Sequence, residues 1–114
     1  MVFAFEGDST LSVYPDANAA AGDHEPIDVE QGAVAFFADD GSRLRPRFTR
    51  LNQRSLFGLV VDQGAFVLEE PTFPVAGDIE GALQRTTSVN PNPYFASLEA
   101  VRQHFAARRR KAAL

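Results

Sequence analysis

Apolar residues fall in short runs along the chain, and Asp, Gly and Pro separate these runs. Val2 to Glu6 suits a strand that is buried on at least one face, with Phe3 and Phe5 opposite Val2 and Ala4. Ala33 to Ala38 and Arg43 to Phe48 flank Asp39-Asp40-Gly41. Asp tolerates a tight turn and Gly supplies positive φ, so this pattern predicts a β-hairpin over residues 33–48.

A second hairpin is predicted over residues 56–69. Leu56 to Val61 is apolar on both faces, Asp62-Gln63-Gly64 provides the turn, and Ala65 to Leu68 returns. A strand with two apolar faces is typical of a sheet interior, so we expect 56–61 near the middle of the sheet. Ile27 to Glu30, after Pro26, is predicted to be extended, and Pro71 and Pro74 are predicted to end the strands.

Three helices are predicted from their start and stop signals. Pro15 and Gly22 bracket the first, and Asp78 caps a second that runs through Leu83, although Gly81 weakens it. The third follows Ser97. Its apolar stripe comprises Leu98, Val101, Phe105 and Ala112, which is typical of a helix packed on one side. His104 lies off that stripe and is expected to face solvent.

These elements predict a single α+β domain over residues 1–114, with a basic tail from about residue 108. Tight turns between neighbouring strands indicate antiparallel pairing. We therefore expect an antiparallel sheet of about five strands with helices packed on one face, in two layers. A chain of 114 residues buries enough surface to fold without a metal or a disulfide.

The composition narrows the setting. The chain has no Cys, which removes disulfides and thiolate metal sites. Its N-terminus lacks the basic start and long apolar run of a secretory signal, and no segment approaches the roughly 20 apolar residues of a membrane span. We expect an acidic cytoplasmic protein with no membrane partner.

No motif indicates catalysis. Neither His has a second ligand at metal-binding spacing, and Asp39-Asp40-Gly41 lacks the alternating oxygen ligands of a calcium loop. No nucleophile elbow or phosphate-binding loop occurs, and Lys111 is the only Lys. Asp28 and Glu30 on one strand face leave acid–base chemistry formally open, but exposed carboxylates are far commoner. We expect no catalytic residue, no cofactor and no metal.

Charge is segregated along the chain. Residues 1–42 contain nine Asp and Glu and no Lys or Arg, five Arg follow between 43 and 54, and residues 108–111 are all basic. Arg43, Arg45 and Arg47 share one face of a strand that Pro46 marks as an edge strand. The arginines either protect that edge from aggregation or bind carboxylate or phosphate. Nucleic acid is disfavoured, because the acidic block repels a polyanion.

Segregated charge without catalytic motifs favours a non-enzymatic protein-interaction domain, such as an inhibitor or immunity-type partner of a basic protein. We expect Asp28, Glu30, Asp39 and Asp40 to meet that partner. Arg43, Arg45 and Arg47 are expected to meet an acidic surface, for which a second copy of this chain is a candidate. The alternative is a small-molecule binder or minor enzyme with a pocket between sheet and helices, which a deep apolar pocket would favour over a flat charged face.

Overall fold

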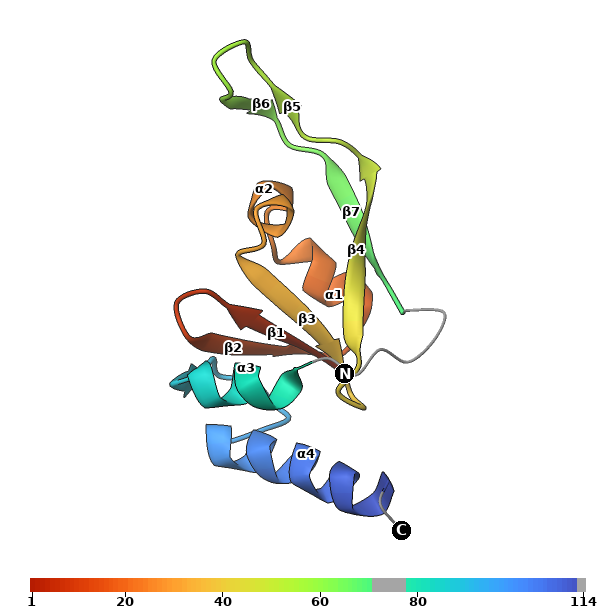
Figure 1. Ribbon diagram of the computed structural model, residues 1–114, viewed down its shortest axis with the longest axis vertical. Coiled ribbons are helices and arrows are strands. Elements are labelled where there is room, and N and C mark those ends of the chain that lie inside the picture. The colour runs from red at the N-terminus through yellow and green to blue at the C-terminus, as the bar shows by residue number, and fades with distance from the viewer. Residues whose placement is uncertain (71–77, 113–114) are drawn as a thin grey trace.

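The computed structural model describes residues 1–70 and 78–112, so the predicted strand ends at Pro71 and Pro74 lie outside the described residues. The fold is α+β and is elongated, with extents of 54 × 30 × 23 Å (Figure 1). Its elements are β1 (Val2–Glu6), β2 (Thr10–Tyr14), α1 (Ala17–Gly22), α2 (Pro26–Glu30), β3 (Val34–Ala38), β4 (Arg43–Arg50), β5 (Gln53–Arg54), β6 (Val60–Asp62), β7 (Ala65–Glu69), α3 (Ile79–Arg85), β8 (Ser88–Val89) and α4 (Leu98–Ala112).

The main sheet is mixed, which corrects the predicted antiparallel sheet of about five strands. Six strands of the described chain follow the order β7-β4-β3-β1-β2-β8. The first five pair antiparallel, whereas β8 runs parallel to β2, with Thr10 opposite Ser88. β5 and β6 form a separate two-stranded ladder. β8 has two residues and pairs with a strand almost 80 residues earlier, so no local sequence pattern predicts this pairing.

Helices cover both faces of the sheet, so the predicted two-layer arrangement is wrong (Figure 1). One face packs against α3 and α4, and the other packs against α1 and α2. β1 shows the cause, because its alternate side chains are apolar on both sides: Phe3 and Phe5 enter the first cluster, and Val2 and Ala4 enter the second. Two apolar faces each need a covering layer.

Most locally signalled elements are confirmed. β3 and β4 pair antiparallel around the predicted turn, where Gly41 has a φ of 87°. The first predicted helix is present as α1, but Pro15 lies before it: Asp16 is its N-cap and accepts a hydrogen bond from the Ala19 amide. Asp78 caps α3 as predicted, by accepting a hydrogen bond from the Gly81 amide. Val101 and Phe105 of α4 are buried as the stripe predicts. Each signal acts within one turn of chain, where sequence patterns are most direct.

The β1–β2 hairpin adds a strand that the sequence prediction lacked. Its turn over Gly7 to Ser9 places Ser9, not a Gly, at a φ of 71°. Thr10 to Tyr14 then alternates buried Leu11 and Val13 with more polar positions. A non-Gly residue at positive φ is uncommon, which is why this turn carries no strong sequence signal.

Two predictions around the arginine-rich region are wrong. Ile27 to Glu30 forms helix α2 and is not extended, since Pro26 occupies the first helical turn, where its missing N–H costs nothing. β4 is not an edge strand, because it lies between β3 and β7. The stretch from Arg45 to Arg50 nevertheless pairs with β7 alone, so Pro46 still has only one neighbouring strand to satisfy.

The second hairpin also differs from the prediction. β7 pairs with β4, and β6 pairs with β5. Residues 56–59 therefore do not enter the main sheet and form a turn at the far end of a projection beyond β4 and β7 (Figure 1). We call residues 51–64, which comprise this projection, the arm. In the part of the chain that the structure describes, each helix is too short or too polar to cross a bilayer.

Candidate functional site

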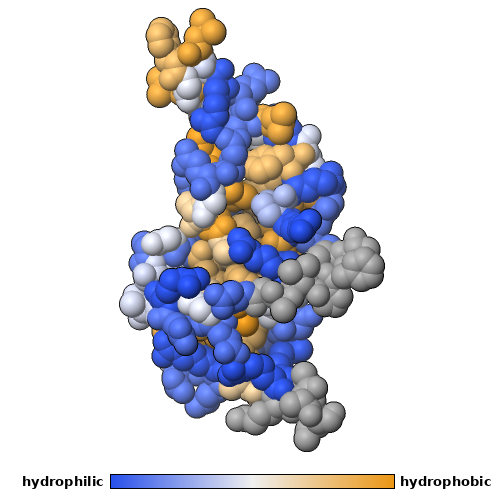
Figure 2. Space-filling model, in the orientation of Figure 1, coloured by the Kyte–Doolittle hydropathy of each residue, from blue (hydrophilic) through white to orange (hydrophobic). Residues whose placement is uncertain are grey.

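The end of the arm exposes three large apolar side chains. Leu56 and Phe57 are 102% and 91% exposed, and Leu59 is 68% exposed. We call these three residues the apolar tip; Figure 2 shows hydrophobic surface gathered at this end of the molecule. Leu51, at the base of the arm, is 73% exposed. Single exposed apolar residues are ordinary, but a contiguous group on a projection is typical of an interaction site.

The turn that carries the apolar tip is built by Ser55 and Gly58. The Ser55 amide donates to the Leu59 carbonyl at 2.7 Å, and the Gly58 amide donates to the Ser55 carbonyl at 3.0 Å. The Ser55 hydroxyl accepts from the amides of Phe57 and Leu59, both at 3.3 Å. Gly58 supplies the φ of 78° that this turn requires. The exposed side chains therefore project from a hydrogen-bonded turn.

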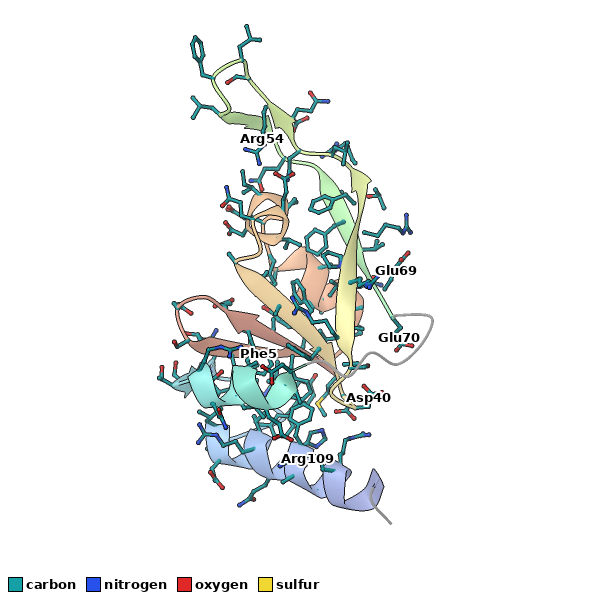
Figure 3. All side chains as sticks on the ribbon, in the orientation of Figure 1. Phe5, Asp40, Arg54, Glu69, Glu70 and Arg109 are labelled. Carbon is teal, nitrogen blue, oxygen red and sulfur yellow. The ribbon has the colours of Figure 1, made fainter. Side chains whose placement is uncertain are left out.

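Asn52 fixes the base of the arm. Its side-chain amide donates to Glu30 Oε2 at 2.9 Å and to the Pro26 carbonyl at 3.4 Å. Its carbonyl oxygen accepts from the Gly64 amide at 2.7 Å. Arg54 pairs with Glu30, and Figure 3 shows its side chain on the α2 side of the arm. The Asn52 side chain thus connects the two strands at the base of the arm with α2.

Helix α2 places acidic groups beside the arm. Glu25, Asp28 and Glu30 are all exposed. Glu30 is held by Arg54 and Asn52, whereas Asp28 has no ion pair within the described residues. The acidic α2 thus lies beside the base of the arm, and the apolar tip lies at its far end (Figure 1). A partner that covers both would combine a desolvating contact with charges that orient it.

The brace between Glu30 and the arm depends on pH. Hydrogen bonds from Arg54 and then Asn52 lower the pKa of Glu30 below its ordinary value of 4.5. The brace is therefore complete above pH 4.5 and is lost as the pH falls through the lowered pKa. We expect the Asn52 side-chain amide resonances to shift below pH 4.5 in an NMR titration, and Glu30→Gln to abolish that shift while Glu25→Gln retains it. A shift unchanged by Glu30→Gln would contradict the brace.

The other predicted partner residues lie elsewhere, and most have partners within the chain. Asp39 accepts from His104 Nε2 at 3.0 Å and pairs with Arg108. Asp40 caps its own turn by accepting from the Ser42 amide and hydroxyl at 2.9 and 2.6 Å, which lowers the pKa of Asp40. Asp39 and Asp40 thus lie near α4, at the opposite end of the molecule from the arm (Figure 3).

The predicted arginine row is present on one face of β4. Arg43, Arg45 and Arg47 are all exposed. The Arg43 guanidinium lies 5.7 Å from the centre of the Phe37 ring, and Arg47 pairs with Glu69 on β7. The structure therefore separates the seven predicted residues into three places: the arm base, the β3–β4 turn and the outer face of β4.

His24 and His104 are both half-buried, and the sequence analysis assigned neither of them a role. His104 is not fully solvent-facing as predicted; it is half-buried, with its ring centre 5.0 Å from that of Phe105 and 5.9 Å from that of Phe3. His24 Nε2 lies 3.2 Å from the Tyr14 hydroxyl, which itself donates to Asp23 at 2.5 Å. Burial, and next the bond to Asp23, raise the pKa of Tyr14 above its ordinary value.

Two cavities lie around α3. A cavity of about 390 Å³ separates α3 from α4, and its lining includes Ile79, Leu83, Phe105 and Ala106. A cavity of about 270 Å³ lies between α3 and the sheet, and its lining includes Phe5, Phe37, Arg43 and Arg85 together with Glu6 and Asp78. Neither cavity adjoins the arm.

Within the described residues, no group of three or more His, Cys, Asp or Glu side chains is arranged to share a metal ion. The side chains of the apolar tip and the acidic side chains of α2 stay in water, so they contribute little buried surface to the stability of the fold. No family model, curated protein or solved structure matches the chain, so the assignment of this surface depends on its own geometry.

Proposed function

We propose that this chain is a non-enzymatic protein-interaction domain and that it binds its partner through the apolar tip and the acidic side chains of α2. The exposure of Leu56 and Phe57 carries the proposal. Fully exposing two such side chains forgoes roughly 1.5–3 kcal/mol of burial for each, and a partner that covers them recovers it. Aromatic anchors of this kind commonly dominate a binding free energy.

The charges beside the tip indicate the kind of partner. Glu25 and Asp28 would face a basic surface, and a shallow apolar recess would receive the tip. An inhibitor or immunity-type protein directed at a basic target is one function of this form. Membrane insertion is less favoured, because Arg54, the one basic residue of the arm, pairs with Glu30 and so offers less charge to lipid phosphates.

We expect the double variant Leu56→Ser/Phe57→Ser to lose its partner. Cross-linking capture from source cells, followed by quantitative mass spectrometry, should recover the partner at least about tenfold less with this variant, as the loss of a central anchor implies. Tyr94→Ser, which removes a 44% exposed ring outside the arm, is the matched control. Equal recovery with both variants would mean that the tip is not the contact surface.

The acidic side chains of α2 are tested separately, by the rate at which the captured partner binds. Charge reversal at Asp28 should slow association without unfolding, and added salt should reduce the difference, because salt screens exposed charges. Reversal at Glu30 is a poorer choice, since Glu30 also holds the arm. Glu70→Lys, at the opposite end of β7, is the control (Figure 3).

A second candidate function is binding of a small molecule in the cavity between α3 and the sheet. Its apolar floor of Phe5 and Phe37 and its two arginines, Arg43 and Arg85, would suit a compact ligand with an anionic group, although Glu6 and Asp78 balance their charge. A ligand at that cavity would raise the melting temperature equally in the wild type and in the tip variant.

A further inference from the structure

The far end of the molecule carries a recess that is apolar in part. The cavity of about 390 Å³ between α3 and α4 has buried Leu83 and Phe105 in its lining and half-buried Ile79 and Ala106 beside them. Charged side chains of both signs complete its lining: Asp40, Glu80, Glu99, Arg102, Arg108 and Arg109. A volume of this order lies within the range of sites that enclose small apolar groups. Figure 1 places α3 and α4 at one end of the long axis and the arm at the other.

Helices α4 and α2 also have opposite net charge. α4 contains five basic residues and one acidic residue between Leu98 and Ala112. α2 and its capping residue contain three acidic residues and no basic residue between Glu25 and Glu30. Arg108 and Arg109 are already paired with Asp39 and Glu80, whereas Arg102, at the recess, donates to the Leu83 carbonyl at 3.4 Å and has no carboxylate partner in the described structure.

We propose that the partner of the apolar tip is a second copy of this chain, in which Leu56 and Phe57 enter the recess between α3 and α4 while α2 faces α4. The inference rests on the proposed function, because it names the partner of the same tip. Two complementarities support it together: the apolar projection fits the apolar part of the recess, and the acidic helix α2 fits the basic helix α4.

The placement at opposite ends determines which assemblies can form. Two copies that lie antiparallel along their 54 Å axes bring each tip to the recess of the other copy and close as a two-fold dimer. Copies that lie head to tail instead repeat the same contact in a longer series. Both assemblies use the same tip and recess, so the same substitutions should weaken both.

Sedimentation velocity of the purified full chain over a range of concentrations tests the inference. The wild type should associate, and Leu56→Ser/Phe57→Ser should weaken association by about thirtyfold or more, the scale of a lost hot spot. Ala106→Trp should fill the recess and have a comparable effect. Ala107→Trp, on the neighbouring exposed position of α4, should associate as the wild type does. Circular dichroism and the melting temperature establish that each variant is folded.

Cross-linking identifies the contact directly, because the chain has no Cys. A mixture of Gln53→Cys in the arm and Gln103→Cys at the recess should give a heterodimer with a short bismaleimide. Gln53→Cys mixed with Asn18→Cys on α1 should give far less. The side chains at positions 53, 103 and 18 are all exposed.

Three outcomes overturn the inference. They are a wild type that stays monomeric at every concentration, association that Ala106→Trp leaves unchanged, and cross-linking that does not favour Gln103 over Asn18. A monomeric chain whose tip variant still loses a captured protein would refute the second copy as the partner and leave the proposed function standing. A chain whose tip variant keeps both self-association and captured proteins would refute both.

Discussion

Phe105→Ala is expected to lower the free energy of unfolding by about 3–5 kcal/mol, the range for removal of a core Phe side chain. Phe105 of α4 is 4% exposed. Its ring centre lies 4.8 Å from that of Phe3, at an edge-to-face angle of 64°, on the sheet face that α3 and α4 cover. The substitution therefore removes both buried area and an aromatic contact that joins helix to sheet.

Phe57→Ala provides the matched control, since it makes the same chemical change at a ring that is 91% exposed. Surface truncations usually stay within about 0.5 kcal/mol. Urea denaturation of both variants, with unchanged m-values, would separate the two effects. A loss below about 0.5 kcal/mol for Phe105→Ala would mean that α4 lies on the surface and does not cover the sheet.

The contrast between these two rings shows what the sequence could predict. The stripe of Leu98, Val101, Phe105 and Ala112 indicates one buried helix face. Val101 and Phe105 are buried, Leu98 is half-buried against the same cluster, and the Ala112 side chain lies outside the described structure. Leu56 to Val61 carries an equally apolar pattern and predicted a strand within the sheet, yet Leu56 and Phe57 are in solvent. A pattern of apolar residues shows which side chains are hydrophobic. It does not show whether the same chain buries them or leaves them exposed, as at an interaction surface.

Local signals were reliable for α3, α4 and the β3–β4 turn, but the local signals at 27–30 and 56–69 failed, and the long-range pairings had no signal. Capping by Asp16 and Asp78 and the Gly41 turn each act over a few residues, and each predicted element is present. The pairing of β8 with β2 depends on chain closure that no local pattern records. The brace of Asn52 on Pro26 and Glu30 is of the same kind, because it joins residues that lie more than 20 positions apart.

The charged residues illustrate a further limit. The sequence separates acids from bases along the chain, but folding brings Glu30 to Arg54, Asp39 to Arg108 and Glu80 to Arg109. Segregation in sequence is thus partly cancelled in space. Of the predicted acidic residues, Asp28 keeps an exposed position without an ion pair in the described chain, next to the arm.

Gly64 is expected to be the most sensitive position of the arm, because it lies where the backbone of β7 approaches the end of β4. A Cβ atom at Gly64 would lie 1.9 Å from the Arg50 carbonyl oxygen and 2.8 Å from the Leu51 carbonyl carbon. Both are backbone atoms, so the clash is relieved only if the strands move apart. The β4–β7 register is already irregular between Phe48 and Arg50.

Gly64→Ala should therefore lower the free energy of unfolding by roughly 1–3 kcal/mol, the usual cost of forcing extra volume into a packed site. It should also weaken the hydrogen bond from the Gly64 amide to Asn52, now 2.7 Å, and so release the arm from α2. Hydrogen exchange should show faster exchange of the Gly64-region amides together with the loss of stability.

Gly22→Ala is the control for this substitution. No atom lies within 4 Å of a Cβ built at Gly22, and its φ is not positive. Gly22 ends α1, where Ala is the better helix former, so this variant should be as stable as the wild type or up to about 1 kcal/mol more stable. If Gly64→Ala were equally harmless, the strands at the base of the arm would be free to separate. The tip would then have no fixed orientation relative to α2, and the binding surface proposed for the tip and α2 would lose its structural basis.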